Sequence, residues 1–179
     1  MNHILNKLHE DHKNISKLLS FLEHQLYLLE KCENSDLSTT LDAIKYMKEY
    51  PDNVHHPLEN IVFKYFLDHH EQAREEITEL LHEHEGMPIL TENLLRMLEG
   101  ALADVPQKRE ELCSCLKKYI SIQKEHMQQE EAYVYPILNS ILDENDWEKI
   151  DNELAHMADP LFGKSLEKTY QGLLLQIIS

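Results

Sequence analysis

Two pairs of histidine and glutamate have a spacing that suits metal ligation. His55 and Glu59 are four residues apart, and His126 and Glu130 repeat that spacing. Residues four apart lie one above the other on a helix. Imidazole and carboxylate groups without thiolates are typical ligands of iron, manganese or zinc. The two pairs therefore predict a metal site built from helical side chains.

Two further histidines interrupt apolar helical patterns. His12 lies in a stripe of Leu and Ile that steps by three and four residues, and His84 continues the steps of Ile77 and Leu81. Buried imidazoles and carboxylates are costly unless they are hydrogen-bonded or bind a metal. For any one of these histidines, a hydrogen-bonded core residue is the simpler explanation. A shared metal site explains all of them together.

The apolar periodicity predicts an all-α fold with four long helices and short turns. We expect them over about residues 1–34, 37–67, 70–103 and 107–142, with Asp36 or Ser35 as a cap and bends near Pro51 and Pro88. Such helices form an up-down-up-down four-helix bundle over residues 1–142. Residues 143–179 then form a helical extension that packs on the bundle or at a homodimer interface.

The four histidines fall at one depth of this bundle. At about 1.5 Å per residue, each lies within about one turn of a common level when the helices alternate in direction. Independent core histidines have no reason to share a level. The predicted ligand set is therefore His12, His55, Glu59, His84, His126 and Glu130.

These side chains are too many for one tetrahedral zinc ion. Two glutamates can bridge two ions, and paired carboxylate and histidine ligands in a four-helix bundle are typical of dinuclear iron or manganese centres. His56 is about 100° round the helix from His55, so we expect it behind the ligands or at the surface, unless Pro51 or Pro57 shifts the helix phase. Glu131 has no assigned role beyond a solvated or supporting carboxylate.

Composition limits the partners. The formal net charge is −16, which argues against nucleic acid and anionic membranes. The three cysteines form neither a CxxC motif nor a disulfide framework. We see no signal-peptide pattern and no apolar stretch long enough to span a bilayer, so we expect a cytoplasmic protein.

The motifs resemble the hemerythrin-like HHE cation-binding family. The matching stretches lie within about residues 1–140 and are "LHEDHKNI", "HHPLENIVF", "LLHEHEG" and "HMQQEEAYVYP". The resemblance implies a non-haem di-iron site that reacts with dioxygen, with carboxylates bridging the irons and histidines as terminal ligands.

Two departures separate the chain from the invertebrate oxygen carriers of this family. The carriers have a second histidine one turn from the first in the third helix, where this chain has Leu80 and Pro88 on either side of His84. Their last carboxylate is an Asp five residues after its His, whereas Glu130 follows His126 by four. The chain is more similar to bacterial HHE proteins and to iron- and oxygen-sensing domains. The missing imidazole predicts an open position on one iron.

We therefore expect a di-iron protein that binds or senses oxygen, peroxide or nitric oxide. The first alternative is a di-iron enzyme that turns over peroxide or nitric oxide or repairs iron–sulfur or nitrosative damage. Iron storage and a metal-free helical interaction module are further alternatives. The sequence leaves manganese and zinc open as the metal.

Overall fold

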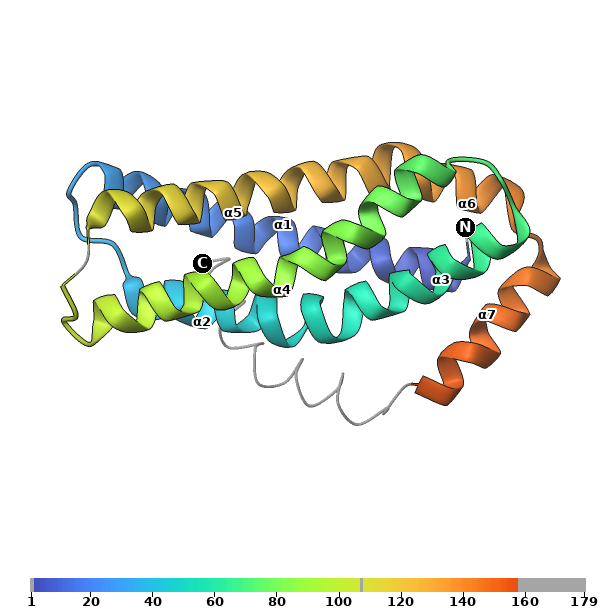
Figure 1. Cartoon of the computed structure of the whole chain (residues 1–179), viewed down its shortest axis with the longest axis horizontal. Coiled ribbons are helices and arrows are strands. Elements are labelled where there is room, and N and C mark those ends of the chain that lie inside the picture. Colours follow the sequence, from blue (N-terminus) through green and yellow to red (C-terminus); the bar gives the residue numbers. More distant parts are fainter. Residues whose placement is uncertain (1, 107, 158–179) are drawn as a thin grey trace.

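The computed structural model of the protein describes residues 2–106 and 108–157, which form an all-α fold (Figure 1). Among these residues there is no β-strand. The elements are α1 (His3–Glu30), α2 (Leu37–Glu49), a π-helical turn η1 (Pro51–His55), α3 (His56–His69), α4 (Arg74–Leu102), α5 (Arg109–Gln129), a second π-helical turn η2 (Glu130–Val134), α6 (Tyr135–Ile141) and α7 (Glu144–Met157).

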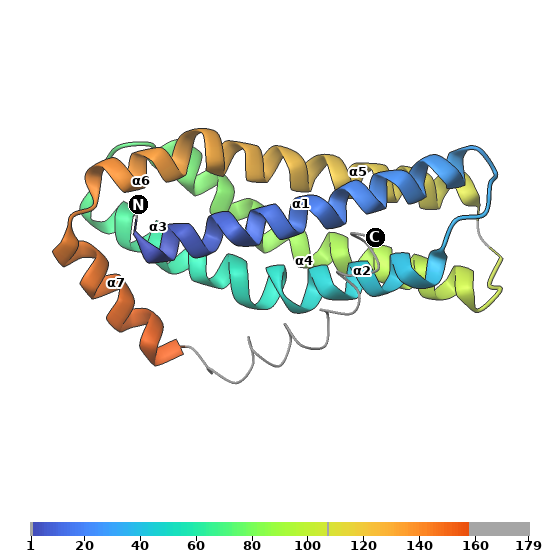
Figure 2. The same cartoon turned by 180° about the vertical axis from the view of Figure 1, so that it is seen from behind.

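Eight of these elements form four long rods that alternate in direction, as predicted. We use "rod" for α1, for α2–η1–α3, for α4 and for α5–η2–α6. Figures 1 and 2 show α1 beside α5 and α4 beside α2, and these pairs make the most extensive contacts. Asp36 caps α2 as expected, because its side chain accepts a hydrogen bond from the backbone N–H of Thr39 at 2.9 Å.

The second and fourth rods each contain a π-helical turn where a proline follows. In the second rod the backbone N–H groups of His55 and His56 donate to carbonyls five residues back, at Tyr50 and Pro51. Pro57 has no N–H, and its ring would collide with a carbonyl four residues back in a regular helix. A wider turn before the proline relieves that conflict. The predicted bend at Pro51 is therefore a change of helix type.

The fourth rod repeats the arrangement. The backbone N–H of Tyr135 donates to the carbonyl of Glu130, and Pro136 follows directly. A π-helical turn inserts one extra residue, so the side chains after it are rotated relative to a continuous α-helix. In α4, by contrast, helical structure continues through Pro88.

The apolar core is divided into two clusters by a polar layer. On α1, for example, Leu8 belongs to one cluster and Ile15 to the other, with His12 between them. The fourth rod shows the same order, with Met127 in one cluster, Val134 in the other and Glu130 between them. The layer lies well inside the bundle, with apolar packing above and below it.

Helix α7 packs against α3. Trp147 is buried, and the Tyr65 hydroxyl donates to Asp146 Oδ1 at 2.8 Å. The domain division at residue 142 and a homodimer interface remain predictions. Residues 158–179 of the predicted helical extension lie outside the described residues. None of the described helices has the length and apolarity needed to cross a membrane.

Candidate metal centre

All six predicted ligands lie together in the polar layer. Each is at most 5 % exposed. They come from the four rods: His12 from α1, His55 and Glu59 from the second rod, His84 from α4, and His126 and Glu130 from the fourth. The fold therefore brings together the four histidines that the sequence placed at one depth, and the two glutamates with them.

The imidazoles converge in two pairs. His12 Nε2 lies 3.0 Å from His55 Nε2, and His84 Nε2 lies 2.9 Å from His126 Nε2. Two ligand atoms about 2.1 Å from one ion and at right angles to each other are about 3.0 Å apart. Each pair therefore has the separation that two nitrogen ligands of a single ion would have.

Each glutamate divides its oxygens between the two pairs. Glu59 Oε1 lies 3.3 Å from His55 Nε2, while its Oε2 lies 3.5 Å from His84 Nε2. Glu130 Oε2 lies 3.3 Å from His12 Nε2, while its Oε1 lies 3.2 Å from His126 Nε2. Two carboxylates that bridged two ions would be arranged in this way.

His56 corrects one expectation from the sequence. Its side chain is buried within the cluster, whereas a regular helix would turn it about 100° away from His55. It stacks on His84 with ring centroids 4.4 Å apart, and one of its ring nitrogens lies within 4.8 Å of potential ligand atoms of Glu59, His84 and His126. The turn η1 changes the helix phase and brings both neighbouring rings inward.

The centre therefore has five imidazoles rather than four. We call His12 and His55 the two-imidazole half, and His56, His84 and His126 the three-imidazole half. His56 from α3 lies beside His84, so this half has a third imidazole although Leu80 and Pro88 flank His84 on α4. The open position on one iron remains a prediction.

The imidazoles are held from behind through their Nδ1 atoms. Acceptor oxygens lie at hydrogen-bonding distance from four of them, in the pairs His12–Glu131 (2.8 Å), His55–Asp11 (3.3 Å), His84–Asn60 (2.7 Å) and His126–Glu83 (2.7 Å). For His56 the nearest such oxygen is that of Asp52, at 3.6 Å. Acceptors behind the ring fix the tautomer and leave Nε2 free to bind a metal. Glu131 is thus a supporting carboxylate, as one sequence interpretation had it.

Tyr135 also reaches the centre, although the sequence analysis gave it no role. Its hydroxyl hydrogen-bonds Glu59 Oε1 and lies 3.4 Å from His12 Nε2. Continuing the helical step of three residues from Glu130 would place Tyr133 beside the site, but Tyr133 is 45 % exposed. The π-helical turn η2 changes the helix phase, so that Tyr135 faces the centre in place of Tyr133. Pro136, directly after Tyr135, was the signal of this turn in the sequence.

The neighbouring carboxylates favour the protonated form of two of the imidazoles, as their pKa values show. Burial alone would lower the pKa of His12, but its contacts with Glu130 and Glu131 raise it to about 10. Burial likewise opposes charge on His126, and Glu130 and Glu83 raise its pKa to about 10. Burial and the neighbouring histidine charges hold the pKa of His56 well below its usual value.

The carboxylates show that hydrogen bonds do not satisfy the centre. Glu59 Oε2 and both oxygens of Glu130 are buried and make no hydrogen bond. Buried polar atoms in native proteins are nearly always paired, and an orphaned set at one place calls for a bound group. Metal cations at the two imidazole groups would satisfy all three oxygens, so the residues present fit a metal pair.

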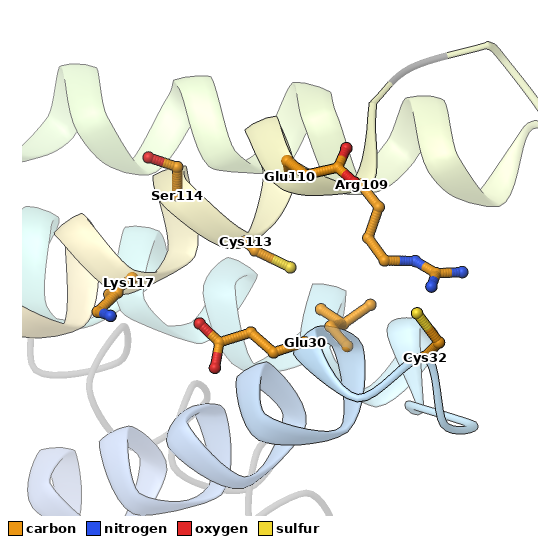
Figure 3. A pocket seen from close by; sticks show the side chains of 8 residues that line it. Glu30, Cys32, Arg109, Glu110, Cys113, Ser114 and Lys117 are labelled. Atoms are coloured by element: carbon orange, nitrogen blue, oxygen red, sulfur yellow. The ribbon is translucent and has the colours of Figure 1, made fainter.

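A surface pocket of about 380 Å³ lies elsewhere, where α1 ends and α5 begins (Figure 3). Cys32 and Cys113 face it, together with Glu30 and Arg109. It contains none of the predicted metal ligands. The chemistry of the protein is therefore to be sought in the buried layer.

Comparison with known families agrees with this geometry. The model of the hemerythrin HHE cation-binding domain matches residues 3–138. The chain belongs to the hemerythrin HHE cation-binding family. No curated protein and no solved structure gave a significant match. The matched range contains every residue of the buried cluster, so the family assignment supports cation binding at this place.

Proposed function

We propose that this HHE domain holds two iron ions and binds or senses dioxygen, peroxide or nitric oxide. The observation that carries the proposal is the division of each carboxylate between two converging imidazole groups. One ion would have His12, His55, Glu59 and Glu130 as ligands. The other would have His56, His84 and His126 with the second oxygens of the same glutamates.

Iron is proposed because the ligand chemistry admits it and the resemblance to hemerythrin-like proteins implies it. Imidazole and carboxylate ligands without thiolate suit iron and manganese, and a bridged pair inside a helical bundle is an established arrangement for both. An iron pair would supply redox chemistry toward small oxygen- or nitrogen-containing ligands. Zinc fits less well, because the three-imidazole half offers five ligand atoms, one more than a tetrahedral structural site takes.

The chain's own residues orient the ligands and exclude water. Phe63 lies parallel to His84 with ring centroids 6.0 Å apart, and Leu8 and Leu80 are fully buried in the adjoining apolar cluster. Such packing restricts the centre to small ligands. A metal-free interaction module is disfavoured, since it would leave three buried carboxylate oxygens without a hydrogen bond.

The test is metal content together with the optical spectrum of protein purified with and without air. We expect about two irons per chain and, after oxidation, near-ultraviolet bands typical of an oxo-bridged ferric pair. Protein that binds no iron when reconstituted anaerobically with ferrous iron would refute the proposal. Catalytic consumption of peroxide or nitric oxide by the loaded protein would assign it to the enzymes instead of the binders.

A further inference from the structure

The Tyr135 hydroxyl lies at one half of the centre only. It donates a hydrogen bond to Glu59 Oε1, the oxygen that faces His55 Nε2 and His12 Nε2. Its ring is nearly parallel to that of His12, with an interplanar angle of 9° and centroids 5.4 Å apart. Tyr135 therefore contacts the two-imidazole half through a ring and through a hydroxyl.

The two halves differ in how many protein atoms they offer. The two-imidazole half has two ring nitrogens and two carboxylate oxygens, whereas the three-imidazole half adds a ring nitrogen of His56. An ion with fewer protein ligands dissociates more readily. Its retention depends more strongly on how firmly each remaining ligand is held.

Glu59 needs such support on this side. Its Oε1 has the tyrosine as hydrogen-bond donor, while its Oε2 has none. A carboxylate on a flexible side chain can rotate, and a rotation that moved Oε1 away would remove one of four ligands from the two-imidazole half. A buried phenol that donates a hydrogen bond to Oε1 restrains that rotation.

We propose that the two-imidazole half holds the exchangeable metal ion of the centre, and that Tyr135 is the positioning residue that retains it through Glu59. This rests on the proposed function. The ion between His12 and His55 is then the first to leave, and the ion in the three-imidazole half remains. If the fold is preserved when this ion leaves, the occupancy of the two-imidazole half would depend on the iron supply.

The experiment measures iron release from anaerobically loaded protein to a coloured ferrous chelator. The wild type should release its two ions in two phases. Tyr135→Phe keeps the ring stacked on His12 and removes the hydroxyl, so it should weaken retention of the first ion about tenfold to a hundredfold. The second phase should not change.

Tyr119→Phe is the matched control, because Tyr119 is a buried tyrosine of the same rod that contacts Thr91 instead of a predicted ligand. It should leave both phases at the wild-type rates. The melting temperatures of the metal-free variants show whether either change acts through folding. If Tyr135→Phe released both ions at wild-type rates, or altered only the second phase, the inference would be wrong.

A tyrosinate-to-iron charge-transfer band in oxidised wild type, lost in Tyr135→Phe, would also overturn it, since a phenolate ligand cannot donate to Glu59. A wild type that takes up two ions and releases them in one phase would refute the asymmetry and leave the proposed function standing. A wild type that takes up no iron would refute both.

Discussion

The rings of His55 and His56 belong to consecutive residues, yet they serve opposite halves of the buried centre. Their centroids are 5.6 Å apart and their planes are tilted by 60°. His55 packs edge-on against His12 at 4.8 Å, and His56 stacks on His84 at 4.4 Å. The turn η1 makes this division feasible, because a regular helix would separate adjacent side chains by about 100°.

Replacing either histidine should therefore remove a different ion. We expect His55→Ala to empty the two-imidazole half and His56→Ala to weaken the other, each lowering the iron content from about two toward about one per chain. In the chelator assay, His55→Ala should lack the fast phase. His82→Ala is the control, since that side chain lies on α4 and is 74 % exposed. A His56→Ala protein with two tightly held ions would remove His56 from the ligand set.

The carboxylate behind His126 should matter almost as much as a ligand. Glu83 Oε2 lies 2.7 Å from His126 Nδ1 and orients the ring. We expect Glu83→Ala to lower metal affinity about tenfold to a hundredfold, measured by competition with a chelator. Glu85→Ala, on the same helix with a side chain 81 % exposed, should bind as the wild type does. Equal losses in both variants would point to general charge instead of ring orientation.

The sequence predicted the parts of the fold that depend on regular helical periodicity. The four rods and the common depth of His12, His84 and His126 follow from steps of three and four residues. His56 and Tyr133 lie in or directly after a π-helical turn, where the assumed 100° per residue fails, so regular helical periodicity misplaces both side chains. In both rods a proline follows within three residues, so the local signal was present. Its effect on helix phase was not readable from periodicity alone.

The supporting acceptors were harder to predict for a different reason. Asp11 and Glu83 each neighbour a predicted ligand in sequence, but each supports a histidine on another rod. Such contacts depend on the rotation of one helix about its axis relative to the next. Periodicity indicates which face is buried, but it does not fix that rotation closely enough to pair individual side chains.

The three thiols should differ in reactivity. Cys32 is exposed, whereas Cys113 is buried and Cys115 is partly buried. Burial raises the pKa of the Cys113 and Cys115 thiols, which lowers the fraction of reactive thiolate. Iodoacetamide at neutral pH should modify Cys32 first, as followed by mass spectrometry of peptides. Cys32→Ser should abolish the fast reaction, and fast labelling of Cys113 in the folded variant would contradict the described burial.

Metal uptake should release protons. In the metal-free protein His12 and His126 have pKa values of about 10, so near neutral pH both are charged and face the two glutamates. Because metal ligation requires neutral imidazole, uptake must displace at least these two protons, and the raised pKa of His55 adds to the number. Apparent affinity should therefore rise with pH from neutrality toward pH 10. Titration with manganese in two buffers of different ionisation enthalpy measures the number released. Release of no protons would contradict the protonated state of the metal-free centre.

The metal-free fold should lose stability over the same pH range. A histidine has a pKa of about 6.5 in an unfolded chain. The raised folded pKa values of His12 and His126 therefore contribute stability that is fully present below about pH 6.5 and is lost as pH rises through about 10. The melting temperature in excess chelator should fall between pH 7 and 10.

Metal-loaded protein should melt at a higher temperature, since metal binding to the folded state stabilises it. Its melting temperature should also fall less with pH, since its ligands are already deprotonated. Circular dichroism at a helical wavelength follows both forms, with His82→Ala as a control that should track the wild type. A melting temperature of the metal-free protein that stayed constant across this range would show that the two imidazolium–carboxylate contacts do not stabilise the fold.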